Sequence, residues 1–105
     1  MLAKLFSLIN KKDQKPMKKI DNHFLYLYST CPFCFRVRVA MTQLGIDMEI
    51  RNIHQGDEHI NALRAGGGST MVPCLRIEED GDIQWMYESG DIVDYLKGKF
   101  GQPVS

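Results

Sequence analysis

The chain of 105 residues has no net charge and no second cysteine pair that would complete a zinc ribbon. Because the formal net charge is +0, composition gives no argument for nucleic-acid binding. Beside a single C-x-x-C pair, the chain has one further cysteine and three histidines, and none of these has the short spacing of zinc ligands. We therefore expect no metal site and no nucleic-acid partner.

The sequence also contains no apolar run long enough to span a bilayer. The first nine residues are mostly apolar, but Lys4 interrupts them and no small-residue cleavage site of a signal peptide follows. Nothing thus indicates the oxidising compartment that a structural disulfide would need. We expect one cytoplasmic domain, because 105 residues can build one core but not two.

Charge is distributed unevenly along the chain. Residues 1–19 contain six lysines and one aspartate, whereas residues 20–105 contain seven basic and twelve acidic residues. We therefore divide the chain into a basic N-terminal arm with a linker, 1–19, and a domain, 20–105. Helical spacing of apolar residues in the arm is consistent with a short amphipathic helix, formed by Leu2, Leu5, Phe6 and Ile9. A weak contact with a membrane surface or a partner, a frayed terminus, and packing on the domain all remain open.

The central motif is Cys31-Pro32-Phe33-Cys34. An apolar, aromatic segment before it, residues 24–28, predicts a buried strand. After the motif, apolar residues recur at helical spacing and Gly45 marks the end of a helix. The two cysteines therefore lie where a strand ends and a helix begins.

This position has consequences for the chemistry of both thiols. Pro32 suits the first helical position, where its missing N–H costs nothing. Cys31 then occupies the N-cap, where free backbone N–H groups and the helix dipole stabilise a thiolate and can lower a thiol pKa from about 8.5 to roughly 3.5–7.5. Cys34 in the first turn can attack a mixed disulfide formed on Cys31. We predict that Cys31 is the nucleophile and Cys34 the resolving thiol.

The rest of the domain predicts the order β-α-β-α-β-β-α. The further elements are a strand at 48–53, a helix at 57–65, a flexible glycine loop at 66–68, strands at 71–77 and 83–87 around an Asp80-Gly81 turn, and a helix that opens at 88–91 with Ser89 as its N-cap. The expected fold is α/β, with a four-stranded mixed sheet covered by helices on both faces. The nucleophile lies at the carboxyl end of the first strand, where open α/β sheets usually bind ligands.

Three motifs in this order resemble those of the glutaredoxins of the thioredoxin-fold superfamily. They are Cys31-Pro32-Phe33-Cys34 after a strand, Met71-Val72-Pro73 before a strand, and Glu88-Ser89-Gly90-Asp91 at the start of the last helix. The third motif is most similar to that of the glutathione-transferase-like branch and of the transferase N-terminal domain. The resemblance covers residues 23–100 and leaves the arm unexplained.

The resemblance implies a glutathione site. It implies a cis peptide bond at Pro73, strand-like pairing of the Val72 backbone with the cysteinyl part of glutathione, and binding of the γ-glutamyl end by Ser89 and Asp91. The full implied set of glutathione-binding residues is Pro32, Phe33, Met71, Val72, Pro73, Glu88, Ser89 and Asp91. Simple capping of the helix is the alternative role of Ser89 and Asp91.

The activity implied by the resemblance is that of a dithiol glutaredoxin. Such an enzyme uses glutathione as co-substrate to reduce protein–glutathione mixed disulfides and protein disulfides, and we expect it to act as a monomer. The alternatives are a glutaredoxin that binds an iron–sulfur cluster and a glutathione-transferase-like binding module. We expect Cys74 to be a buried small side chain, although an oxidation-sensitive third thiol stays open, and the three histidines to lie on the surface or in loops.

Overall fold

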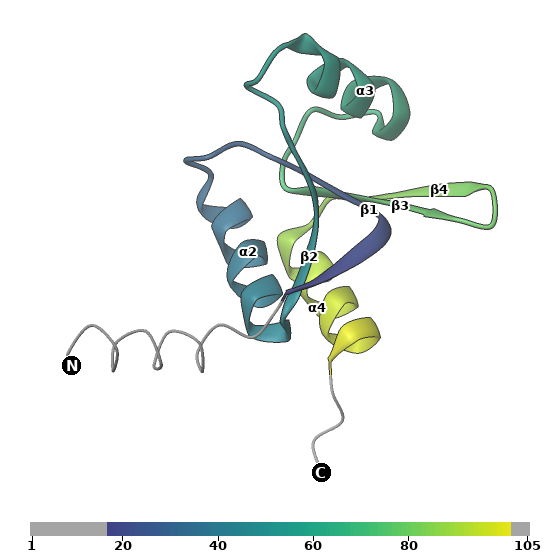
Figure 1. Cartoon of the computed structure of the whole chain (residues 1–105). Coiled ribbons are helices and arrows are strands. Elements are labelled where there is room, and N and C mark those ends of the chain that lie inside the picture. Colours follow the sequence, from purple (N-terminus) through teal and green to yellow (C-terminus); the bar gives the residue numbers. More distant parts are fainter. Residues whose placement is uncertain (1–16, 102–105) are drawn as a thin grey trace, which may run out of the picture.

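The computed structural model describes residues 17–101 and has the predicted order β-α-β-α-β-β-α in that range (Figure 1). Its elements are β1 (Lys18–Leu27), α2 (Pro32–Leu44), β2 (Ile46–Asn52), α3 (Asp57–Gly67), β3 (Cys74–Glu79), β4 (Asp82–Met86) and α4 (Ser89–Phe100). The strands form one mixed sheet in the order β2-β1-β3-β4, with only the β1–β2 pair parallel. The expected thioredoxin fold is confirmed. None of the helices in residues 17–101 has both the length and the apolar character that crossing a membrane requires.

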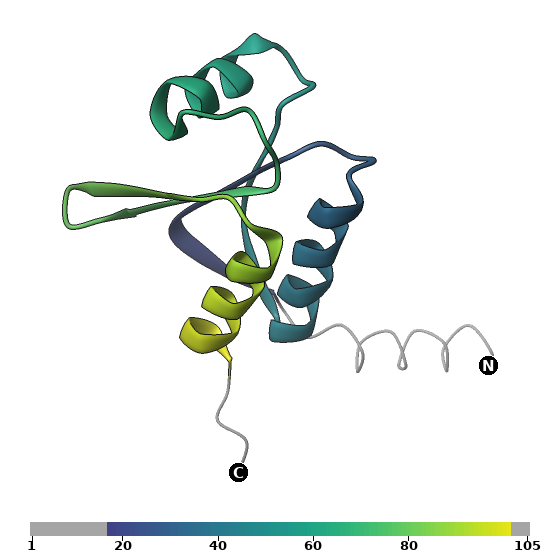
Figure 2. The same cartoon turned by 180° about the vertical axis from the view of Figure 1, so that it is seen from behind.

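Alternating side chains of β1 supply a core on each face of the sheet. Leu25 and Leu27 point into the larger core, which α2 and α4 cover, and Tyr26 points into the smaller core beneath α3. Figure 2 shows α2 and α4 next to each other, with α3 on the other side of the strands. Burial on both faces explains why the segment 24–28 is almost uniformly apolar.

Strand β1 begins six residues before the predicted strand. The Lys18 and Lys19 positions pair with Ile46 and Asp47 of β2, and the ladder is interrupted before Phe24 by an irregularity that contains Asn22 at φ 66°. Hydrophobic periodicity did not predict this extension of the strand, because it begins with two lysines and the pairing with β2 is interrupted after them. Residues 17–19 of the segment predicted as arm and linker therefore belong to the described chain, and residues 1–16 lie outside it.

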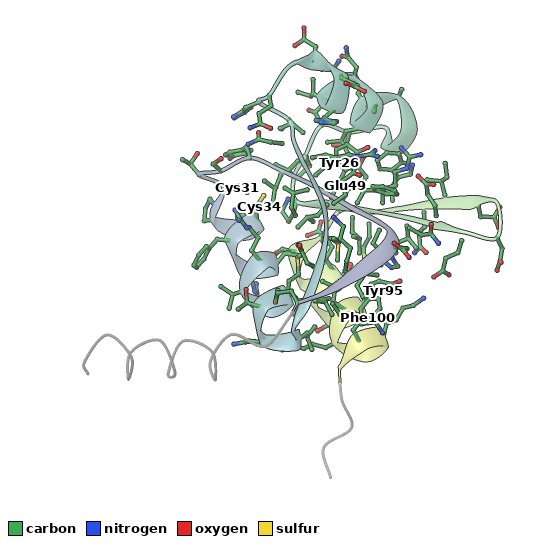
Figure 3. All side chains as sticks on the ribbon, viewed as in Figure 1. Tyr26, Cys31, Cys34, Glu49, Tyr95 and Phe100 are labelled. Carbon is green, nitrogen blue, oxygen red and sulfur yellow. The ribbon has the colours of Figure 1, made fainter. Side chains whose placement is uncertain are left out.

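The prediction that all three histidines lie on the surface or in loops is wrong for His23, which is 4% exposed. Its Nδ1 is 2.8 Å from the Asp21 carbonyl oxygen and its Nε2 is 2.8 Å from the Tyr95 hydroxyl. The Phe100 ring packs edge-on against the imidazole, with 5.6 Å between the two ring centroids. Figure 3 labels Tyr95 and Phe100 on α4. His23 is buried because residues more than 70 positions away supply one of its two hydrogen bonds and the rings that pack against it.

The prediction that residues 66–68 form a flexible loop is also wrong. Helix α3 continues through Gly66 and Gly67 and ends at Gly68, whose N–H donates to the Arg64 carbonyl. A Cβ atom at Gly66 would lie 2.2 Å from the Trp85 ring. The two glycines therefore allow the end of α3 to approach Trp85 in β4 and Tyr87 directly after it.

Candidate active site

Cys31 occupies the N-cap of α2, as predicted. Its backbone is extended (φ −76°, ψ 117°), Pro32 stands at the first helical position, and the Cys31 Sγ accepts a hydrogen bond of 3.2 Å from the Cys34 N–H. Figure 3 shows the two labelled cysteines where the chain enters α2. A backbone donor and the positive end of a helix thus face the sulfur.

Cys34 lies one turn further on, and it is more deeply buried than Cys31. The two residues are 1% and 4% exposed, and both are free thiols. Burial, with a contribution from the hydrogen bond to Cys31, raises the pKa of the Cys34 thiol to about 12. Cys34 therefore stays protonated at neutral pH and can donate its proton toward the Cys31 sulfur.

The loop before β3 crosses next to the nucleophile. The Cys31 Sγ lies 3.9 Å from the Val72 carbonyl oxygen, and the Val72–Pro73 peptide bond is cis, as the resemblance implied. Pro73 is buried, Val72 is half-buried and Met71 is 67% exposed. Strand β3 begins only at Cys74, three residues later than predicted, because Pro73 has no N–H to donate to a ladder.

The start of α4 lies at the same end of the sheet. Tyr26 pairs with Cys74 and Leu75 pairs with Met86, so the chain segments after β1, before β3 and after β4 are adjacent. These segments carry the three motifs. The tertiary structure therefore brings the C-P-F-C motif, the proline loop and the Glu88–Asp91 segment to one edge of the sheet.

The expectation that Ser89 caps α4 is wrong. Glu88 is the N-cap and Ser89 the first helical residue, and in the described chain no side chain forms a capping hydrogen bond at this helix start. The first intrahelical bond joins the Ile92 N–H to the Glu88 carbonyl. Because a helix leaves its first N–H groups without an intrahelical acceptor, this end of α4 can accommodate an anionic group. The carboxylate of the exposed Asp91 lies in the same first turn.

Tyr28 is a site residue that was not found from the sequence. The nearby Cys31 sulfur is the main reason why the pKa of the Tyr28 hydroxyl lies above its ordinary value. The ring stacks on His54 at a centroid distance of 4.8 Å, and the Tyr28 carbonyl accepts from the Cys31 N–H at 3.2 Å. The sequence did not indicate the contact between Tyr28 and Cys31, because Tyr28 ends an apolar run and was predicted to be part of the strand. In the structure β1 ends at Leu27, and Tyr28 lies between the strand and the motif.

Exposed apolar side chains flank the buried cysteines. Phe33 is 60% exposed in the motif, and Met71 stands next to the residue whose carbonyl contacts Cys31. Pro32 and Glu88 are also exposed. A substrate that reaches the Cys31 sulfur would therefore encounter apolar surface supplied by α2 and by the loop before β3.

The arrangement defines a class of protein: a thioredoxin-like fold with a C-P-F-C pair at a helix N-terminus beside a cis-proline. Residues 25–104 match the family of the glutathione S-transferase N-terminal domain. The chain belongs to this family.

Two relatives combine the fold with sequence similarity. Glutaredoxin 2 of Escherichia coli strain K12 is 30% identical over 80 residues, which are 76% of this chain and 35% of that protein. The glutaredoxin-like NrdH-redoxin of E. coli, described as having a thioredoxin-like activity profile, superposes with a TM-score of 0.57 at 25% identity and covers 79% of this chain and 97% of its own. The present chain spans about a third of the length of the curated relative it matches.

A third relative has been solved with glutathione in its active site. This is maleylacetoacetate isomerase from Anaeromyxobacter dehalogenans, with a TM-score of 0.61 and 26% identity over 79% of this chain and 39% of the isomerase. Among these relatives, the isomerase is thus the one whose structure shows glutathione in a domain of this fold.

Proposed function

We propose that this protein is a glutathione-dependent thiol-disulfide oxidoreductase, a dithiol glutaredoxin that acts in the cytoplasm as a monomer. The observation that carries the proposal is the environment of Cys31, whose sulfur accepts the Cys34 N–H at the start of α2 and lies beside the Val72 carbonyl. A thiolate at this position is the group that attacks a disulfide.

The reaction begins with attack of the Cys31 thiolate on the glutathione sulfur of a protein–glutathione mixed disulfide. The Cys31–glutathione bond forms, the old S–S bond breaks, and the protein thiolate leaves and takes up a proton. A second glutathione thiolate then attacks the mixed disulfide, which releases oxidised glutathione and regenerates Cys31. For protein disulfides, the Cys31 thiolate first attacks one sulfur of the substrate disulfide, and the other substrate sulfur leaves as a thiolate. Cys34 gives up its proton to that released thiolate as its own sulfur attacks the Cys31–substrate bond, which closes a Cys31–Cys34 disulfide and releases the second substrate sulfur as a thiolate that takes up a proton. Two glutathiones then reduce the Cys31–Cys34 disulfide and leave as oxidised glutathione.

Glutathione would lie across the edge where the three motifs converge. The Val72 backbone pairs with its cysteinyl part, while Pro73 and the apolar Phe33 and Met71 border the sulfur. The γ-glutamyl carboxylate meets the free N–H groups and hydroxyl at Ser89. Support for this placement comes from the absence, in the described chain, of a side-chain cap on α4. Asp91 takes the ammonium group, with Pro32 and Glu88 at the borders of the site.

The test is reduction of a glutathionylated peptide by glutathione. The wild-type protein should catalyse it, Cys31→Ser should abolish catalysis, and Cys34→Ser should retain much of it because the monothiol cycle needs only Cys31. An inactive Cys34→Ser variant beside an active Cys31→Ser variant would reverse the two roles.

The iron–sulfur alternative calls for a separate experiment. A [2Fe–2S] cluster bridged between two copies would use the Cys31 thiolate and glutathione as ligands. Anaerobic reconstitution with iron, sulfide and glutathione should leave the protein colourless and monomeric if it is an oxidoreductase. A stable visible-absorbing dimer with negligible reductase activity would support the alternative.

A further inference from the structure

One side chain connects two of the three segments that meet at the site. The Tyr87 hydroxyl accepts a hydrogen bond of 3.3 Å from the Ser69 N–H and donates one of 3.0 Å to the Ser69 carbonyl. Ser69 begins the loop that leads to Val72 and Pro73. Tyr87 itself lies between the end of β4 and Glu88, the N-cap of α4.

Close packing holds the Tyr87 ring in this place. A Cβ atom at Gly67 would lie only 1.8 Å from the Tyr87 hydroxyl oxygen, so the end of α3 touches the phenol directly. The ring also packs in the smaller core with Leu63 and Cys74. Gly67 therefore provides the space that the Tyr87 hydroxyl occupies.

We propose that Tyr87 is a positioning residue for glutathione: through Ser69 it holds the Val72–Pro73 loop at a constant place relative to the start of α4. This inference rests on the proposed function. In that proposal the Val72–Pro73 loop binds the cysteinyl part of glutathione, and the start of α4 binds its γ-glutamyl end. A ligand that spans both segments binds tightly only if their separation is set before it arrives.

The nucleophile does not depend on this connection. Cys31 is held by the cap of α2, where its sulfur accepts the Cys34 N–H. Removal of the Tyr87 hydroxyl should therefore weaken recognition of glutathione and leave the reactivity of Cys31 nearly unchanged. Loss of one ordinary hydrogen-bonded anchor corresponds to about a fivefold change in binding.

The decisive comparison is between Tyr87→Phe and Tyr95→Phe. Both variants lose one hydroxyl and keep the ring, but the Tyr95 hydroxyl bonds His23, outside the three motif segments. With a glutathionylated peptide and glutathione, Tyr87→Phe should raise the apparent KM for the peptide about fivefold while kcat changes less than twofold. Tyr95→Phe should leave KM unchanged. Gly67→Ala, which displaces the same hydroxyl from the other side, should follow Tyr87→Phe.

A second readout reports on the anchor without turnover. Exchange of the Ser69 amide hydrogen should be faster in Tyr87→Phe than in wild type or Tyr95→Phe, because this amide donates to the removed oxygen. An unchanged KM in Tyr87→Phe, or an equal rise in both variants, would overturn the inference while the proposed function stands. A wild-type protein without glutathione-dependent turnover would instead overturn the proposed function, and the inference with it.

Discussion

At the scale of single residues, the three thiols are all buried and differ in the groups around them. Cys31 faces a backbone donor at a helix start, Cys34 lies buried behind it, and Cys74 is 0% exposed at the beginning of β3. Burial raises the pKa of the Cys74 thiol to about 12. The structure thus supports the expectation that Cys74 is a buried small side chain. The Cys74 thiol does not readily lose its proton, and an oxidant does not readily reach its sulfur.

We expect Cys74→Ala to retain catalysis. Mild peroxide treatment of the wild-type protein should yield a Cys31–Cys34 disulfide with Cys74 still free, because Cys74 is enclosed in the core under α3. Mass mapping of the oxidised protein provides the measurement. A dominant disulfide from Cys74 to either active-site cysteine would show that all three thiols form one site.

The raised pKa of Cys74 also predicts how stability depends on pH. Between its ordinary value near 9 and about 12, the unfolded chain has lost the thiol proton while the folded chain keeps it. The folded state then binds more protons, so the free energy of unfolding falls as pH rises, by about 1.4 kcal/mol per pH unit for this thiol, and is unaffected below this range.

Urea unfolding under reducing conditions can isolate this contribution. The stability difference between wild type and Cys74→Ala should narrow by about 1 kcal/mol from about pH 8 to about pH 10, since the variant lacks the group that titrates. Groups that do not contact Cys74 contribute equally in both proteins and cancel. Cys74 also helps to raise the pKa of Tyr87, so the loss of this contribution in Cys74→Ala acts in the same direction. A difference that stays constant across this range would mean that burial does not shift the Cys74 pKa.

At the scale of elements, the last turn of α3 packs closely against two aromatic side chains. Gly66 and Gly67 are poor helix formers, yet α3 continues through both, and Trp85 and Tyr87 leave no space for a side chain at either position. Helix propensity alone predicts an earlier end, and this explains why the sequence suggested a loop.

A pair of glycine substitutions tests this account. Gly66→Ala should lower stability by about 1–3 kcal/mol, since its Cβ would lie 2.2 Å from the Trp85 ring and force it to move. Gly98→Ala in α4 is the matched control: in the described chain nothing lies within 4 Å of its Cβ, so helix propensity should raise stability by up to about 1 kcal/mol. Thermal denaturation of both variants gives the comparison, and equal effects would contradict the packing argument.

At the scale of the whole molecule, the sheet holds the site together and the basic arm leads into its first strand. The Lys18 N–H donates to the Gly45 carbonyl at 2.9 Å, so the described chain starts next to the end of α2. The function of residues 1–16 remains a prediction from their composition.

Truncation should therefore remove residues 1–16 and keep Lys18 and Lys19 in the sheet. If the arm serves location, the shortened protein should reduce small glutathionylated substrates at the wild-type rate but bind anionic vesicles more weakly. Vesicle sedimentation measures the binding. A fall in melting temperature without a change in vesicle binding would show that the arm packs on the domain instead.

The sequence alone determined the order of elements, the helix end at Gly45, the hairpin turn and the position of Cys31. Each of these follows from neighbours along the chain. Gly45 (φ 69°) ends α2, the Asp80-Gly81 turn has positive φ at both residues, and Cys31 precedes a proline in a strand-to-helix connection. Local backbone preferences are strong enough at such positions to be recognised without the fold.

Only the tertiary structure decided the burial of His23, the start of β1 and the helical glycines at the end of α3. Each depends on residues far away in the chain: His23 on Tyr95, the start of β1 on β2, and the two glycines on the side chains of Trp85 and Tyr87. Ser89 is a good capping residue by type, yet its hydroxyl leaves the helix start uncapped. Packing and pairing between distant segments override local preference wherever they bury more surface or satisfy more hydrogen bonds than the local alternative.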